Sequence, residues 1–237
     1  MKILALDSSA VAASVALCED ERLIAQSFQN SGLTHSRTLM PMTSDMLRNC
    51  GASLDQVDVI AVAAGPGSFT GLRIGVAAAK GLAFADHKPC AGVSTLEALA
   101  WVFSHLEGAE LCPVMDARRS QVYNARFEVR DAMPCRLTED RAISLPELAE
   151  ELFARGKEQI LVGDGAVLCY NDFKARGLAV RLAPPHLRFQ SAWGVARAAL
   201  EKAKHGELVS AGELAPVYHR LSQAERERLE RLGNCRK

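Results

Sequence analysis

The stretch VDVIAVAAGPGSFTGLRIGVAAAKGLAFA, residues 57–85, decides the fold because a glycine-rich loop joins two apolar segments within it. The first segment, residues 57–62, is short, β-branched and almost free of polar side chains, which predicts a buried strand. The second segment, residues 75–85, is rich in alanine and too long for a strand, which predicts a helix. The stretch therefore predicts a strand, a loop and a helix in direct succession.

The loop between these segments contains Gly65, Gly67 and Gly71, which permit positive φ and the close approach of another group. Ser68 and Thr70 can cap the helix that follows. Backbone N–H groups and the helix dipole at such a loop can hold an anion, but a tight turn that binds nothing has the same pattern. The residues leave these two interpretations open. A P-loop is excluded because no lysine follows the last glycine.

Two short strands that each end in an aspartate indicate that the chain contains two similar halves. Residues 2–7 end at Asp7, and two further strands follow within residues 12–27. Residues 111–116 repeat the pattern and end at Asp116. Three strands in a meander with an acid after the first resemble the opening of an actin-like ATPase or sugar-kinase domain. Two such acids can hold a Mg²⁺-nucleotide across a cleft, or each can cap a turn; the residues favour the turn.

The rest of the chain alternates between short strands and helices, which predicts an α/β protein. Ser-x-x-Glu capping boxes open the helices at residues 94–103 and 144–155. The helix at residues 191–205 is small and apolar on one side, and we expect it to cross back to the first half. The turn with Gly163 and Gly165 either approaches a nucleotide or reverses the chain. The other predicted elements are helices at 36–49 and 167–175 and strands at 90–93, 121–129, 159–162 and 179–182.

The composition restricts the class of protein. The 237 residues, 49% of them hydrophobic, suit one large domain or two of about 100 residues each. The 28 basic and 28 acidic residues give a net charge of zero, which argues against a general electrostatic grip on nucleic acid. The 7 cysteines form no C-x-x-C pair, which indicates reduced thiols. Because Asp7 interrupts the first apolar run and no apolar segment is long enough to span a bilayer, we expect a cytoplasmic protein without membrane contact.

The string GPGSFTGLRIG at residues 65–75, followed by AKGLA at residues 79–83, resembles the glycoprotease-like branch of the actin, Hsp70 and sugar-kinase superfamily. Within that branch the chain is similar to the bacterial TsaB (YeaZ) family. The likeness covers nearly the full length. Four other stretches agree with it: the opening strand with Asp7, residues 34–36, residues 115–119 and residues 216–221.

The resemblance implies the two-lobed actin-like/Hsp70-like (ASKHA) α/β fold, in which each lobe has a mixed sheet of the five-stranded type with flanking helices. Residues 1–104 would form the N-terminal lobe, with the glycine loop and a partner interface. Residues 105–237 would form a smaller second lobe, with the helix at 191–205 packing back toward the first lobe and a charged C-terminal tail.

The resemblance also implies a role in tRNA modification without catalysis by this chain. The catalytic relative TsaD transfers a threonylcarbamoyl group to N6 of adenosine at position 37 of tRNAs that read ANN codons, and it carries a His-x-x-x-His metal pair. Here the two positions would be Thr95 and Leu99, which do not ligate as imidazole does, and none of the 6 histidines lies four residues from another. The resemblance therefore implies no metal site and argues against a glycopeptidase. It implies a non-catalytic subunit that binds and stabilises or activates a TsaD-like catalytic subunit.

The implied partners are that TsaD-like subunit, a TsaE-like ATPase and, in isolation, a second copy of this chain as a homodimer, with tRNA contacted mainly through the complex. The helices at residues 36–49 and 75–85 would form the interface, because methionine and small residues suit close-packed, adaptable surfaces. Core packing of the methionines is the competing interpretation, which the residues favour. The interface would comprise Leu39, Met42, Met46, Phe69, Thr70, Leu72, Arg73, Val76 and Lys80.

A stand-alone ATPase or phosphotransferase of the actin-like or sugar-kinase class is the alternative function. It would use a remnant nucleotide site, and weak binding of ATP or ADP with Mg²⁺ is the one cofactor expected there. That site would comprise Asp7, Ser8, Gly65, Gly67, Ser68, Asp116, Arg118, Gly163 and Gly165.

Overall fold

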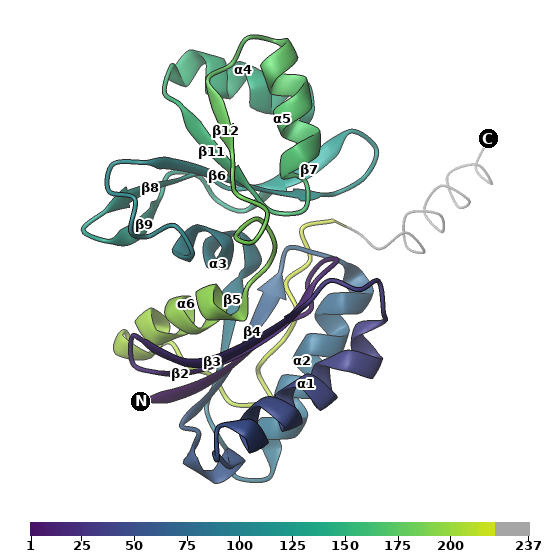
Figure 1. Ribbon diagram of the computed structural model, residues 1–237, viewed down its shortest axis with the longest axis vertical. Coiled ribbons are helices and arrows are strands. Elements are labelled where there is room, and N and C mark those ends of the chain that lie inside the picture. The colour runs from purple at the N-terminus through teal and green to yellow at the C-terminus, as the bar shows by residue number, and fades with distance from the viewer. Residues whose placement is uncertain (221–237) are drawn as a thin grey trace, which may run out of the picture.

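The structure, a computed structural model, describes residues 1–220 and consists of two lobes, each built on one β-sheet (Figure 1). The strands of the first sheet are β1 (Lys2–Asp7), β2 (Ala13–Glu19), β3 (Arg22–Gln29), β4 (Val59–Gly65) and β5 (Cys90–Ser94). Their order is β3-β2-β1-β4-β5, with an antiparallel meander from β1 to β3 and parallel pairing of β1, β4 and β5. Helices cover both faces of β1 and β4, which explains why these two strands are almost continuously apolar.

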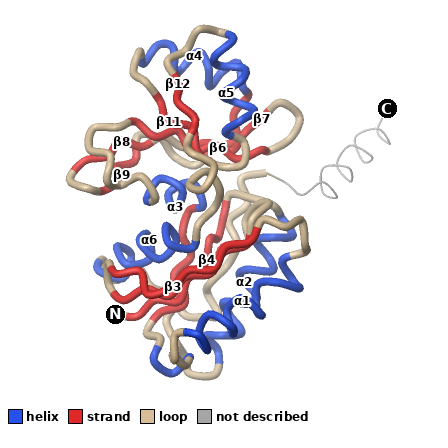
Figure 2. The backbone as a smooth tube through the Cα atoms, in the orientation of Figure 1, coloured by secondary structure: helices blue, strands red, loops and turns tan. Residues whose placement is uncertain are grey.

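The second sheet repeats this plan. Its strands are β6 (Glu110–Asp116), β7 (Gln121–Asn124), β8 (Phe127–Arg130), β9 (Met133–Arg136), β10 (Arg141–Ser144), β11 (Gln159–Val162) and β12 (Val180–Leu182). The main path β10-β7-β6-β11-β12 has the order of the first sheet, and β8 and β9 form a hairpin attached to β6 (Figure 2). The expected five-stranded plan is therefore present in both lobes, and the hairpin makes the second sheet seven-stranded.

Helices cover the faces of the sheets (Figure 1). They are α1 (His35–Asn49), α2 (Phe69–Phe84), α3 (Thr95–Trp101), α4 (Leu145–Arg155), α5 (Ala166–Ala175) and α6 (Ala192–Lys204), with a 3-10 turn η1 (Leu54–Gln56). Alternate residues of β1 point to opposite faces of the first sheet. Ile3 and Ala5 pack with α6 on one face, and Leu4 and Leu6 pack with α1 and α2 on the other. Helices α4 and α5 cover the second sheet.

Helix α3 lies between the two lobes and packs on both. Its residues Ala98 and Trp101 belong to the core beside the first sheet, whereas Leu96 and Leu99 belong to the core beside the second sheet. Helix α6 lies across α3, and Gly194 allows the approach because a Cβ there would lie 1.9 Å from the Ala98 carbonyl oxygen. The chain between β5 and β6 is therefore the joint of the molecule.

The last described residues pack against the first lobe. Helix α6 contacts β1, β2 and β5, Val209 forms an antiparallel bridge with Cys90, and Leu214 is buried among first-lobe residues. Residues 192–218, which their position in the sequence assigned to the second lobe, therefore lie with the first lobe. The small apolar side of α6 fits the sheet of that lobe. The predicted charged tail lies beyond residue 220, outside the described residues.

Several element boundaries differ from those predicted, and two of the differences have a clear physical reason. Helix α2 begins at Phe69, within the expected loop, because the Ser68 hydroxyl caps it by accepting a hydrogen bond from Gly71 N. The strand expected at 121–129 is divided into β7 and β8, and the buried amide of Asn124 bonds backbone carbonyls at the division. In residues 1–220 no helix combines the length and apolar character needed to cross a bilayer.

The two predicted capping boxes have different outcomes. At Ser144 the box is complete, since the serine and Glu147 bond each other's backbone N–H. At Ser94 the hydroxyl accepts a hydrogen bond from Glu97 N, but the Glu97 carboxylate pairs with Arg136 of the β8–β9 hairpin. The ion pair between Glu97 and Arg136 thus takes the place of the hydrogen bond from Ser94 N to the Glu97 carboxylate that a complete capping box would have.

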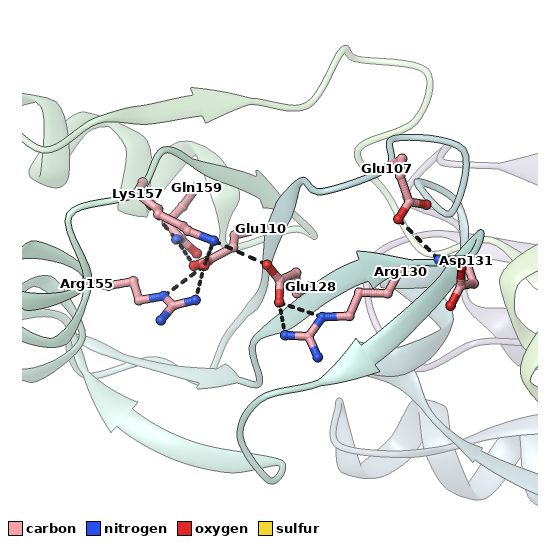
Figure 3. Close-up of polar contacts among 8 residues, drawn as sticks. All are labelled: Glu107, Glu110, Glu128, Arg130, Asp131, Arg155, Lys157 and Gln159. Atoms are coloured by element: carbon pink, nitrogen blue, oxygen red, sulfur yellow. Dashed lines mark hydrogen bonds and ion pairs between the residues drawn. The ribbon is translucent and has the colours of Figure 1, made fainter.

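A cluster of ion pairs lies at the edge where β6 and β11 begin (Figure 3). Glu110 is 2% exposed and accepts hydrogen bonds from Arg155 Nε at 2.8 Å and Gln159 Nε2 at 2.6 Å. Lys157 Nζ lies 3.3 Å from Glu110 Oε1 and 3.2 Å from Glu128 Oε1. The cluster joins the end of α4 to the β8–β9 hairpin.

Candidate functional site

The glycine loop between β4 and α2 is packed against the turn that follows β1. Ser68 N donates to the Ser9 carbonyl at 2.6 Å, and Ser8 Oγ donates to the Gly71 carbonyl at 2.9 Å. A Cβ at Gly71 would lie 2.1 Å from the Ser8 carbonyl oxygen, and one at Gly67 would lie 2.4 Å from that of Ser9. The chain's own backbone therefore uses the close approach that these glycines permit, which favours the tight turn over an anion site.

Asp7, at the end of β1, is fully buried, and its carboxylate serves the turn after the strand. Its Oδ1 accepts hydrogen bonds from Ser9 N at 2.9 Å and from Ser9 Oγ at 2.6 Å. Its Oδ2 has no partner in the part of the chain that the structure describes. Burial raises the pKa of Asp7 to about 6, against the lowering effect of the Ser9 bonds. This geometry agrees with the turn-capping interpretation that the residues favoured.

A cleft of about 640 Å³ lies between the lobes, beyond the carboxyl ends of the central strands. Four residues of the expected nucleotide site line it: Gly67, Ser68, Asp116 and Arg118. The others are buried in the walls: Asp7, Ser8, Gly65, Gly163 and Gly165. The structure thus brings the two halves of the predicted site together but turns most of its residues away from the open space.

Sequence reasoning missed two parts of this cleft. Asp164 lies in the turn after β11, where its Oδ1 accepts a hydrogen bond from Gln190 Nε2 at 3.0 Å. Burial raises the pKa of Asp164 to about 6, although the Gln190 bond lowers it. The signal for this residue was its position in a glycine turn after a strand. Residues 217–220 also line the cleft, and only their resemblance to the family distinguished them in the sequence.

The structure describes no transition-metal site. Within residues 1–220, no three side chains of the His, Cys, Asp or Glu type gather closely enough to hold a metal ion. Thr95 and Leu99, the positions that resemble the metal pair of TsaD, are fully buried in α3. The Leu99 side chain packs in the core beside the second sheet, so neither position presents a ligand to the cleft.

The two helices expected to carry the partner interface each bury one side against the first sheet. Leu39, Met46, Leu72 and Val76 are at most 6% exposed, so their side chains face the protein interior and are not part of the exposed surface of these helices. The physical reason is that an amphipathic helix turns its apolar stripe to the sheet. Met42 is partly buried in the same core.

The other predicted interface residues reach the surface along α2. Phe69 and Lys80 are partly exposed, and Thr70 and Arg73 are exposed. Lys80 Nζ donates to the Gly212 carbonyl at 3.2 Å. The outward line of α2 consists of exposed side chains and a glycine at helical spacing: Thr70, Arg73, Ala77, Gly81 and Phe84.

Comparison with known proteins agrees with this architecture. The family described as "TsaD: tRNA N6-adenosine threonylcarbamoyltransferase" matches residues 23–160. The Escherichia coli tRNA threonylcarbamoyladenosine biosynthesis protein TsaB is 32% identical over 222 residues, 93% of this chain and 95% of the relative. The Bacillus subtilis protein of the same name is 34% identical over 163 residues, 69% of this chain and 71% of the relative.

Solved structures extend the comparison to the fold. YeaZ from Pseudomonas aeruginosa superposes with a TM-score of 0.78 at 30% identity, covering 92% of this chain and 99% of that one. Component A of (R)-2-hydroxyglutaryl-CoA dehydratase from Acidaminococcus fermentans has a TM-score of 0.50 at 12% identity, covering 86% of this chain and 99% of that one, which shows the fold alone. The expected two-lobed ASKHA fold is confirmed. By sequence over most of its length and by structure over both lobes, the chain belongs to the TsaB (YeaZ) family.

Proposed function

We propose that this chain takes part in forming N6-threonylcarbamoyladenosine in tRNA as a non-catalytic subunit that binds and stabilises a TsaD-like catalytic subunit. The relatives named tRNA threonylcarbamoyladenosine biosynthesis protein TsaB support the pathway. The match to the TsaD family is consistent with a shared ancestry of the two subunits. A TsaE-like ATPase, and tRNA held mainly by the catalytic subunit, complete the proposed assembly.

The residues at the position of the TsaD metal pair carry the non-catalytic part of the proposal. Thr95 and Leu99 are buried in the helix that joins the lobes, and neither offers an imidazole. Repacking α3 to expose a ligand there would open the core between the sheets. We infer that α3 has a structural role, the packing of the two lobes, and holds no catalytic metal.

The outward sides of α1 and α2 are the proposed docking surface. Figure 1 shows the two helices side by side on the same face of the first sheet. Phe84 is 74% exposed and Met40 42% exposed, and such large apolar side chains on neighbouring helices favour a protein interface. Ala77 and Gly81 leave room for a partner helix to approach closely. A homodimer in isolation would use the same surface and compete with the partner.

Ala77→Arg tests this surface, because it places a long cation in the middle of the outward line without touching the core. We expect the affinity for a co-expressed TsaD-like subunit to fall about tenfold or more, as for an interface residue that excludes water. Titration calorimetry or co-purification measures the effect. Ala154→Arg, at another exposed alanine, on α4, is the matched control and should bind as the parent does. Equal binding by all three proteins would remove α2 from the interface.

A stand-alone ATPase is the second candidate function, supported by the size of the cleft and by Asp116 at its edge. It has less support because Ser8 and Ser9 fill the glycine loop and Asp7 is engaged in its turn. Weak binding of ATP or ADP with Mg²⁺ therefore remains a proposal for the open part of the cleft. We expect purified chain to hydrolyse ATP no faster than its Asp116→Asn variant; a clear excess in the parent would favour the ATPase.

A further inference from the structure

The segment 214–220, here called the strap, runs back along the first lobe after α6 and reaches the mouth of the cleft. Leu214 is buried in the first-lobe core, and Val217 N donates to the Ala64 carbonyl at 2.8 Å. The Val217 carbonyl lies against Gly65, where a Cβ would be 2.2 Å away. In Figure 1 the strap is the last part of the yellow trace, just before the grey residues, where the trace approaches the second lobe.

Tyr218 anchors the strap on the first turn of α2. The rings of Tyr218 and Phe69 stack with centroids 4.5 Å apart. Arg73 Nε donates to Tyr218 Oη at 3.0 Å, and its guanidinium lies 3.9 Å from the centre of the Phe69 ring. Stacking, a hydrogen bond and a cation–π contact thus hold three side chains together.

Arg220, two residues after Tyr218, connects the strap to the second lobe. Arg220 Nη1 donates to the Ala117 carbonyl at 2.6 Å, in the turn between β6 and β7. The next residues, Arg118, Arg119 and Ser120, have φ of 61°, 55° and 56°. Three consecutive non-glycine residues in the left-handed region persist only when neighbouring contacts hold them. The Arg220 bond is one such contact, and the bond from Arg118 N to Asp116 Oδ1 is another.

These contacts are separate from the places where the chain itself passes between the lobes. The chain passes between them through α3 and again between β12 and α6, and bonds such as Ser94 Oγ to Asp140 reinforce that connection. The strap adds a non-covalent link across the cleft that residues 217–220 themselves line. Opening the lobes about the joint would have to break the Arg220 bond or pull Tyr218 from Phe69.

We propose that the strap is a latch that holds the two lobes closed over the cleft, and that it is released through the start of α2. One hydrogen bond from a charged donor favours the closed state by about tenfold, which is small enough for binding energy elsewhere to reverse. Arg73 belongs both to the anchor and to the outward line of α2. A partner that engages Arg73 therefore competes with Tyr218. This release step rests on the proposed function, whereas the latch itself does not.

Hydrogen exchange of the purified full-length chain tests the latch. Arg220→Ala should speed exchange of the amides in residues 115–121 about five- to tenfold and leave the melting temperature unchanged. Tyr218→Ala should have the same local effect, and Tyr218→Phe, which keeps the stack, a smaller one. Arg176→Ala, which breaks an exposed ion pair with Asp172 on α5, is the control and should exchange as the parent does.

Unchanged exchange at 115–121 in both Arg220→Ala and Tyr218→Ala would overturn the latch. Faster exchange spread evenly over both lobes would overturn it too, because that pattern indicates a structural role only. The release step has its own measurement: adding the TsaD-like subunit should speed exchange at 115–121 in the parent but not further in Arg220→Ala. If the TsaD-like subunit binds and exchange at 115–121 is unaffected, the release step is wrong and the proposed function stands. If the subunit does not bind, the proposed function is wrong, and the exchange of the variants alone decides on the latch.

Discussion

At the scale of single residues, buried acids show how position alone changes the chemistry of a side chain. Asp7 and Glu110 are both almost inaccessible to solvent. Among residues 1–220, Asp7 receives hydrogen bonds from Ser9 alone, so burial dominates and its pKa rises to about 6. Burial acts in the same direction on Glu110, but bonds from Arg155, Gln159 and Lys157 outweigh it and lower the pKa. The two acids should therefore give opposite dependences of stability on pH.

Asp7→Asn should stabilise the chain above pH 6. The pKa of Asp7 rises from an ordinary 3.8 to about 6 on folding, so the stability that this group contributes is complete below its unfolded pKa and is lost as the pH rises through about 6. Asparagine keeps the Oδ1 acceptor for Ser9 and cannot ionise. We expect a gain of about 2 kcal/mol at pH 8 and none at pH 4, measured by denaturant unfolding. Asp55→Asn, at an exposed acid, should show no such gain at pH 8.

Glu110→Gln should destabilise the chain at neutral pH. Because folding lowers the pKa of Glu110, its contribution is present above the unfolded pKa and is lost as the pH falls through the folded pKa. The change weakens the charged hydrogen bonds with Arg155 and Lys157 shown in Figure 3, and we expect a loss of about 2 kcal/mol at pH 7. The difference from the parent should shrink as unfolding is repeated at lower pH. A constant difference across the titration would contradict an electrostatic origin.

At the scale of elements, one glycine sets how closely two helices cross. Gly194 on α6 faces the backbone of α3, whereas Gly81 on α2 lies on the surface, where an added Cβ would have no atom within 4 Å. The same substitution should therefore act in opposite directions at these two helix-interior sites. For alanine in place of Gly194, the gain in helix propensity is opposed by the close packing of α6 on α3. For alanine in place of Gly81, helix propensity acts alone.

Gly194→Ala should destabilise the chain by about 1–3 kcal/mol, because the new Cβ would lie 1.9 Å from the Ala98 carbonyl oxygen and α6 must move. Gly81→Ala should stabilise it by about 0.5–1 kcal/mol through helix propensity. Thermal unfolding of both variants gives the comparison. A stabilised Gly194→Ala protein would mean that α3 and α6 do not cross as closely as the structure shows.

At the scale of the whole molecule, the chain consists of two copies of one strand order with a shared helix between them. Asp7 and Asp116 stand at matching strand ends, as the sequence predicted from their similar surroundings. Helix α3 packs on both lobes, and the strap, which lines the cleft between them, forms a separate link through Arg220. The proposed docking surface on α2 and the cleft between the lobes are connected through Phe69, Arg73 and Tyr218 at the start of α2.

Local patterns determined much of this structure. The apolar run before Gly65, the capping box at Ser144 and the alternation of strands and helices predicted the elements, because short-range sterics and backbone hydrogen bonding act within a few residues. The glycine string was enough to indicate the family. It was not enough to choose between an anion site and a packed turn, since both need the same backbone freedom.

Tertiary structure alone decided what the elements face. Leu72 and Arg73 are neighbours on α2, yet one is core and the other surface, because the sheet that α2 covers is assembled from distant strands. The role of Tyr218 and Arg220 depends on Phe69 and Ala117, which lie more than a hundred positions away. No local pattern encodes such contacts; they exist only because folding brings residues 214–220 back to a place where both lobes are within reach.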